Sequence, residues 1–176
     1  SEAAAFAANH HRHRRGHIVA DAVDIAAATH RLHRGRTAGP VADTVAVFDS
    51  SNRESWENWF HALPAALQDI NFSYDYQMLY ELNGDGSIRL FIYKEQDSIF
   101  YYPFLIRAIS NSVIGDGYLD IENVYGYTGP LWSSQDSGFR ERASEAFHTW
   151  CKEHKVVCEF IRFHPLLHNA IEAKKE

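Results

Sequence analysis

The sequence of residues 118–163 is YLDIENVYGYTGPLWSSQDSGFRERASEAFHTWCKEHKVVCEFIRF, and this stretch decides the fold. Residues 118–124 and 156–163 are apolar runs of the length and composition of buried strands. Between them, apolar residues recur at helical spacing, and Asp136 or Ser137 can cap the start of a helix. A strand, a helix and a strand in this order predict a right-handed crossover between two parallel strands.

Two further strands are predicted upstream, over residues 88–94 and 99–109, where β-branched and aromatic residues dominate. The four residues 95–98 between them have the length of a hairpin connection, so we expect an antiparallel pair. Pro103 cannot donate to a ladder and predicts an edge, a bulge or a bend in the second strand. The chain is therefore expected to be an α/β protein whose mixed sheet contains one antiparallel hairpin and one parallel β-α-β crossover.

Two short helices are predicted before the hairpin, over residues 55–63 and 74–82, because apolar side chains recur there at helical spacing. Residues 83–86, Asn-Gly-Asp-Gly, supply the stop of the second helix. We expect both apolar stripes to lie in the core, including, in the second helix, Tyr74, Met78, Leu79 and Leu82.

The first 45 residues differ in composition from the rest of the chain. They are rich in Ala, His and Arg and contain no Trp or Tyr, which is typical of disordered segments. We therefore expect residues 1–45 to be a disordered leader, either added to the protein or due to a misplaced start, and residues 46–176 to form the domain. Alternatively, its clustered His and Arg side chains make the leader a metal or nucleic-acid tether carried by an inert domain.

Charge, cysteines and hydropathy disfavour several classes of protein. The formal net charge of −6 at pH 7 disfavours broad binding to nucleic-acid backbones, which requires Lys and Arg. Cys151 and Cys158 are the only cysteines, and we expect two reduced, buried thiols rather than a disulfide framework. No apolar run approaches the roughly 18 residues of a membrane span, and no signal peptide is recognisable. We expect a cytoplasmic protein without a membrane span.

Ligands of parallel α/β units bind beyond the carboxyl ends of the strands. Here those ends carry residues 125–130, YGYTGP, and residues 162–165, RFHP. The glycines of the first segment let the backbone turn tightly, and its tyrosines combine an apolar body with a hydroxyl. A plain tight turn is the alternative. The substrate-binding candidates in this turn are Tyr125, Gly126, Tyr127 and Gly129.

Charged residues near the same strand ends complete the candidate site. Alternation along the last strand places Arg162 and His164 on one face, where Arg162 can bind a carboxylate or phosphate and His164 can transfer a proton. Asp120 and Glu122 share a strand face and are candidate general bases. The alternative is that these carboxylates are counter-ions of Arg162 within the sheet. Arg107, near the end of the second hairpin strand, is a further substrate-binding candidate.

Three sequence blocks occur in a recognisable order: YPFLIR at residues 102–107, DI at 120–121 followed by YGYTGPL at 125–131, and EFIRFHPLL at 159–167, followed by Asn169. Together they resemble the Fem-like branch of the GNAT acyltransferase superfamily. The resemblance covers about residues 55–169. That branch includes aminoacyltransferases that build peptidoglycan cross-bridges and N-acyltransferases encoded with bacterial surface-polysaccharide pathways.

The resemblance implies transfer of an acyl or aminoacyl group to an amine, without a metal. The donor would be acyl-CoA or aminoacyl-tRNA, and the acceptor a small-molecule or cell-wall precursor amine. The implied fold is a GNAT-like mixed sheet whose central strands splay to admit the donor. Further strands would follow the last block, so residues 46–176 are expected to form a partial domain, incomplete at the C-terminus. The alternative is a noncatalytic acceptor-binding half or an inactive fragment.

Overall fold

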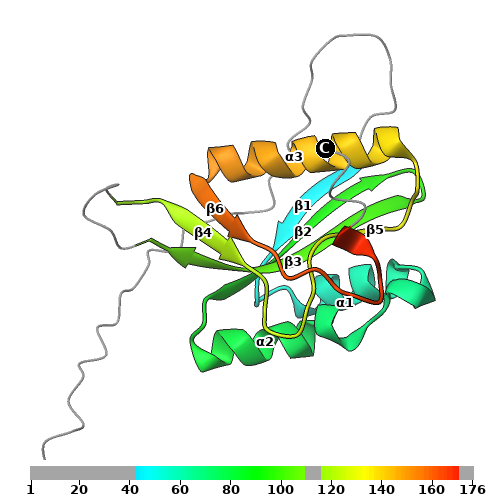
Figure 1. Cartoon of the computed structure of the whole chain (residues 1–176). Coiled ribbons are helices and arrows are strands. Elements are labelled where there is room, and N and C mark those ends of the chain that lie inside the picture. Colours follow the sequence, from blue (N-terminus) through cyan, green and yellow to red (C-terminus); the bar gives the residue numbers. More distant parts are fainter. Residues whose placement is uncertain (1–42, 110–115, 171–176) are drawn as a thin grey trace, which may run out of the picture.

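A mixed β-sheet lies between two layers of helices in the computed structural model of the chain, which describes residues 43–109 and 116–170 (Figure 1). Within these residues the sheet has six strands. Their order is β1 (Thr44–Phe48), β2 (Ser87–Glu95), β3 (Ser98–Ala108), β4 (Leu119–Glu122) and β6 (Val156–Phe160), while β5 (Leu131–Trp132) pairs with β3 beside β4. One face carries α1 (Arg53–Ala62), α2 (Tyr74–Asn83) and the short turns η1 (Ala65–Leu67) and η2 (Ile70–Phe72), and the other carries α3 (Ser137–Glu153).

The predicted hairpin and the predicted parallel crossover are both confirmed. The prediction that residues 156–163 form a buried strand is wrong, because β6 ends at Phe160, is the last strand in the sheet order and is mostly exposed. Strands β2 and β3 pair antiparallel, and β4 and β6 pair parallel and are joined through α3. The connection of the hairpin is shorter than predicted, because Glu95 pairs with Ser98 and only residues 96–97 form the turn. Strands β1 and β5 were not predicted. β5 has only two residues, and β1 overlaps the end of the expected leader, residues 1–45.

Pro103 lies within β3 opposite Leu90, in the middle of the sheet. On the other side of β3, β5 pairs with residues 100–101 and β4 with residues 105–108, so the ladder is interrupted at Pro103. The carbonyl oxygen of Pro103 accepts instead from the side chain of Asn123, at 3.4 Å. A proline fits here because no main-chain acceptor on that side requires its missing N–H.

Alternate residues of β2 and β3 face opposite helical layers, as the pleat of a strand requires. Trp56 and Tyr101 belong to the core beneath α1 and α2. Phe147 of α3 lies in the other core, with ring centroids 5.2 Å from Phe91 and 5.1 Å from Tyr102. The predicted apolar stripe of α3 is confirmed at its buried members Phe139, Ala143 and Phe147.

The predicted core stripe of α2 is wrong in part, because Leu79 and Leu82 are 60% and 75% exposed. The helix instead turns Tyr76 and Tyr80 toward the loop after β4, where both hydroxyls donate to the carbonyl oxygen of Tyr125. Each tyrosine packs its ring against the core while its hydroxyl reaches a polar partner. The buried residues of α2 are Tyr74 and Gln77.

The expectation of two buried thiols is wrong for Cys158. This residue is exposed on β6, the last strand in the sheet order, whereas Cys151 of α3 is partly buried. Burial, with the nearby charge of Glu159, raises the pKa of the Cys151 thiol to about 12. Both cysteines are free, as expected.

No helix within residues 43–109 and 116–170 is long and apolar enough to cross a membrane. The predictions for the leader concern residues 1–45, of which residues 1–42 lie outside the part of the chain that the structure describes. The sheet begins with β1 at Thr44.

Candidate functional site

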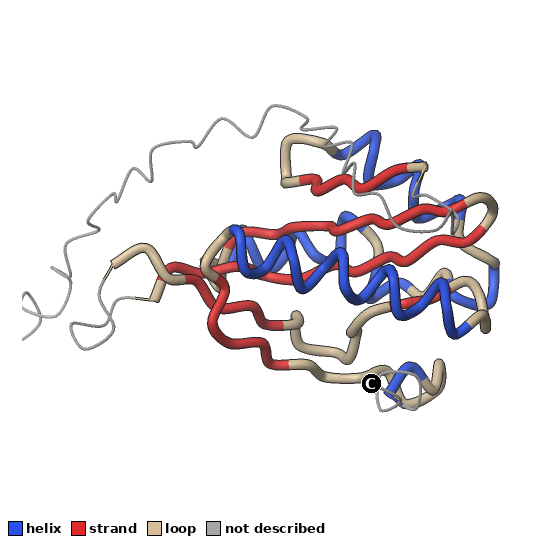
Figure 2. Tube along the Cα trace, turned by 90° about the horizontal axis from the view of Figure 1, so that it is seen from above, coloured by secondary structure: helices blue, strands red, loops and turns tan. Residues whose placement is uncertain are grey.

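Strands β4 and β6 run side by side until Asn123, whose main-chain N–H donates to the carbonyl oxygen of Phe160 at 3.2 Å. The next donor on the β6 side, the main-chain N–H of Arg162, bonds to the side-chain oxygen of Asn123 instead, at 3.1 Å. The two segments pair again where the N–H of Thr128 donates to the carbonyl oxygen of Arg162, at 2.8 Å. Figure 2 shows the tan loop segments that continue from the ends of the strands. Residues 124–127 therefore leave the sheet as a loop beside α2, which we call the 124–127 loop.

The 124–127 loop is tied to the helical layer through its main-chain oxygens. The hydroxyls of Tyr76 and Tyr80 lie 2.9 Å and 2.8 Å from the carbonyl oxygen of Tyr125. The side-chain amide of Asn71 donates to the carbonyl oxygen of Gly126 at 2.5 Å. These bonds leave the exposed ring of Tyr125 available to a ligand while the loop itself is held in place.

Gly126 has a φ of +117°, and an added Cβ would lie 2.5 Å from the hydroxyl oxygen of Tyr76. We expect Gly126→Ala to lower the free energy of unfolding by about 2 kcal/mol, measured by urea denaturation, because the backbone is strained and Tyr76 must give up its bond. Gly84→Ala is the matched control, with a φ of +87° and nothing within 4 Å of the added atom. It should cost about 1 kcal/mol. Equal losses would contradict a tight contact at Gly126.

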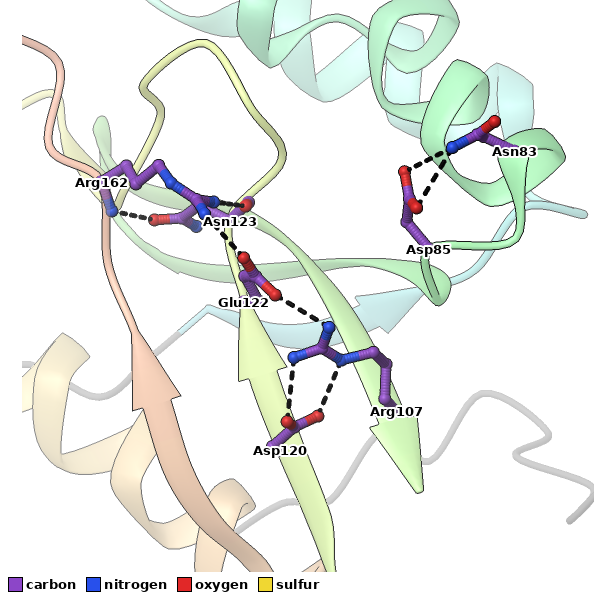
Figure 3. Close-up of polar contacts among 7 residues, drawn as sticks. All are labelled: Asn83, Asp85, Arg107, Asp120, Glu122, Asn123 and Arg162. Atoms are coloured by element: carbon purple, nitrogen blue, oxygen red, sulfur yellow. Dashed lines mark hydrogen bonds and ion pairs between the residues drawn. The ribbon is translucent and has the colours of Figure 1, made fainter. Parts of the chain in front are cut away.

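Four charged side chains form an ion-pair ladder beside the loop (Figure 3). Arg107 binds Asp120 through two hydrogen bonds, of 3.1 Å and 2.9 Å, and lies 2.9 Å from Glu122. Arg162 binds the other oxygen of Glu122 at 2.8 Å and the carbonyl oxygen of Asn123 at 2.7 Å. The hydrogen bond to Asp120 raises the pKa of the Arg107 guanidinium. The alternative in which Glu122 is a counter-ion of Arg162 is thus confirmed, and Asp120 is the counter-ion of Arg107.

A cavity of about 150 Å³ opens beside this ladder. This volume is well below the roughly 300 Å³ of the smaller ligand pockets. It can hold the head group of a ligand rather than a whole cofactor. Four of the predicted site residues line it, namely Arg107, Glu122, Tyr125 and Arg162. Among the lining residues that were not predicted, Tyr80 and Asp85 carry ionisable side chains.

His164 does not line this cavity. It is 7% exposed, its ring centroid lies 6.1 Å from that of Phe72, and its Nε2 lies 3.7 Å from a carboxylate oxygen of Asp69. Arg162 lines the cavity, whereas His164, four residues after the end of β6, packs against Phe72 near η2.

The other candidates lie around the cavity rather than in its wall. Asp120 does not line the cavity, but it pairs with Arg107, which does. Tyr127 is half-exposed and has a φ of +70°. A Cβ on Gly129 would lie 3.1 Å from the side-chain nitrogen of Asn169, so this glycine is required for packing.

The two segments that were predicted to converge do so through Asn169, which is 2% exposed. Its side-chain oxygen accepts from the N–H of His164 at 2.9 Å. Its amide nitrogen donates to the carbonyl oxygens of Thr128 and Pro130, at 2.7 Å and 3.1 Å. Asn169 thus fixes the position of the YGYTGP turn relative to the segment after β6.

Comparisons of the chain with protein-family models, with curated proteins and with solved structures gave no match. In the described ranges, 43–109 and 116–170, no group of three or more His, Cys, Asp or Glu side chains is arranged to hold a metal ion.

Proposed function

We propose that this domain transfers an acyl or aminoacyl group to an amine acceptor in bacterial cell-wall or surface-polysaccharide synthesis. The supporting observation is the cavity beyond the carboxyl ends of the parallel strands β4 and β6, where ligands of such units bind. The sequence blocks that resemble the Fem-like branch meet around it. The proposed donors, acyl-CoA and aminoacyl-tRNA, are cytoplasmic compounds, so we place the reaction in the cytoplasm. The proposed acceptor is a small-molecule or cell-wall precursor amine.

In this reaction the amine nitrogen attacks the carbonyl carbon of the donor, a C–N bond forms, and the thiol or ribose hydroxyl leaves with a proton. Negative charge develops on the carbonyl oxygen, and an N–H donor aimed at it lowers the barrier. Arg162 uses two N–H groups for Asn123 and Glu122, and a guanidinium has five. We assign to Arg162 the role of donating a remaining N–H to this oxygen.

One observation favours a second candidate, a noncatalytic unit that binds the acceptor. Both predicted general bases, Asp120 and Glu122, are paired with guanidinium groups, and the cavity is smaller than a complete acyl donor. A site with these properties can bind an amine head group without catalysing its acylation.

Mass spectrometry of a panel of amines, incubated with the full chain and either acetyl-CoA or alanyl-tRNA, tests the proposal. We expect an acylated product and a rate about 100-fold lower in Arg162→Gln, the loss typical of removing one such donor. In that variant Glu122 still forms its ion pair with Arg107, so the fold should persist. Arg53→Gln, on the exposed side of α1, is the matched control and should keep the full rate. Amine binding without any product would support the second candidate.

A further inference from the structure

The charges around the cavity do not balance. Three carboxylates, those of Asp85, Asp120 and Glu122, accompany the two guanidinium groups of Arg107 and Arg162. The guanidinium groups pair with Asp120 and Glu122, so the remaining negative charge belongs to Asp85. No cationic side chain among the described residues pairs with Asp85, which is therefore the one carboxylate in the cavity wall available to a cation.

Asp85 is held in this position by the end of α2. The helix ends at Gly84, in the left-handed conformation, and the main-chain N–H of Asp85 donates to the carbonyl oxygen of Tyr80 at 3.0 Å. The next residue, Gly86, passes so close to Arg107 that an added Cβ would lie 2.9 Å from its Cγ. The turn thus fixes Asp85 beside the ladder.

The carboxylate of Asp85 makes few hydrogen bonds within the fold. Among residues 43–109 and 116–170, its two oxygens accept only from the side-chain amide of Asn83, at 3.2 Å and 3.1 Å, and Asn83 itself is exposed (Figure 3). A carboxylate offers about four acceptor positions, so most of those on Asp85 are unused. Replacing it by the amide of the same shape should leave the fold intact.

We propose that the carboxylate of Asp85 binds the ammonium group of the acceptor, so that the cavity takes the head group of a primary amine. This inference rests on the proposed function and deepens it, because it assigns a residue to acceptor recognition. The guanidinium groups of the ladder are donors only and cannot accept from an ammonium group. Asp85 can, through a charge-assisted hydrogen bond. The size of the cavity also suits a head group.

Tyr80, which lines the same cavity, adds no competing charge. Burial, together with its contact with Tyr76, raises the pKa of the Tyr80 hydroxyl to about 12. This hydroxyl is neutral at physiological pH and donates to the carbonyl oxygen of Tyr125. Because Glu122 is paired with Arg107 and Arg162, the carboxylate of the cavity wall that has no cationic partner among the described residues is that of Asp85.

Two small probes that differ in one group test the inference. L-Alaninamide carries a primary ammonium group and no carboxylate, whereas lactamide has a hydroxyl in the same place. In a nuclear magnetic resonance titration of the ¹⁵N-labelled full chain, we expect L-alaninamide to shift the amide signals of Asp85, Gly86 and Arg107, and lactamide to bind at least about tenfold more weakly.

The variant Asp85→Asn should weaken the binding of L-alaninamide at least about tenfold and leave that of lactamide unchanged. Asp97→Asn is the matched control, since it removes the same charge from the exposed turn between β2 and β3 and should leave both affinities unchanged. Equal affinity for L-alaninamide in Asp85→Asn and in the unaltered chain would overturn the inference. An absence of shifts at this cavity in the unaltered chain would overturn it too.

The titration uses no acyl donor, so its outcome is separate from that of the transfer assay. Binding of L-alaninamide that depends on Asp85, without acylation of any amine, would overturn the enzymatic function and leave the amine site. Acylation that proceeds equally well in Asp85→Asn would overturn the role of Asp85 and leave the enzymatic function.

Discussion

Replacing Arg142 with methionine should lower the free energy of unfolding by about 2 to 3 kcal/mol. Glu95, at the end of β2, is 6% exposed, and Arg142 of α3 binds both of its carboxylate oxygens, at 2.9 Å and 2.7 Å. Without the guanidinium group, the buried carboxylate of Glu95 loses its cation and, among the described residues, keeps only the hydroxyl of Tyr93 as a donor, at 3.0 Å. We expect a loss at or just below the lower limit of the roughly 3 to 5 kcal/mol typical of broken buried pairs, because the Arg142 side chain is 34% exposed.

Urea denaturation of four chains measures this effect: the unaltered protein, Arg142→Met, Glu95→Gln and the double variant. The double variant should recover at least half of the loss, since the neutral amide that replaces the Glu95 carboxylate no longer needs a cation. Arg53→Met, which breaks the exposed pair with Glu57, is the control and should have a much smaller effect. If the double variant lost as much free energy of unfolding as the two single variants together, Glu95 and Arg142 would not be coupled.

Glu95 also shows what the sequence could not reveal about the fold. Residues 95–98 are polar and were therefore assigned to the connection, yet β2 extends through Glu95 because a cation on α3 is available to it. Local pattern cannot detect this partner, which is 47 residues away in the chain. The crossover was predictable because its helix has apolar residues at helical spacing and its two strands are apolar runs.

The candidate site was predictable where it depends on topology. Parallel strands β4 and β6 bring Tyr125, Glu122 and Arg162 to the same edge, as the order of elements requires. Strand alternation placed His164 on the same face as Arg162, but His164 does not line the cavity. Asp85 was missed because an Asp between two glycines was taken only as the end of a helix. Its place in the cavity wall depends on the packing of α2 against the sheet.

Replacing Asn169 with alanine should have an effect at least as large as that of Arg142→Met, about 3 kcal/mol in the free energy of unfolding. The change removes one acceptor and two donated hydrogen bonds from buried main-chain groups of His164, Thr128 and Pro130. Each buried group left without a partner costs about 1 to 3 kcal/mol, and partial solvation keeps the total near the lower end of the sum.

The same substitution should release the segment after β6 from the YGYTGP turn. Urea denaturation measures the stability, and hydrogen exchange of the His164 amide, which donates to Asn169, reports the local effect. Leu166→Ala, at a side chain that is 79% exposed in the same segment, is the control and should change neither quantity. If the His164 amide stayed protected in Asn169→Ala, its order would come from other contacts. Because Asn169 contacts no residue of the ladder directly, the loss of amine binding in this variant would show that the cavity depends on the convergence of the two segments.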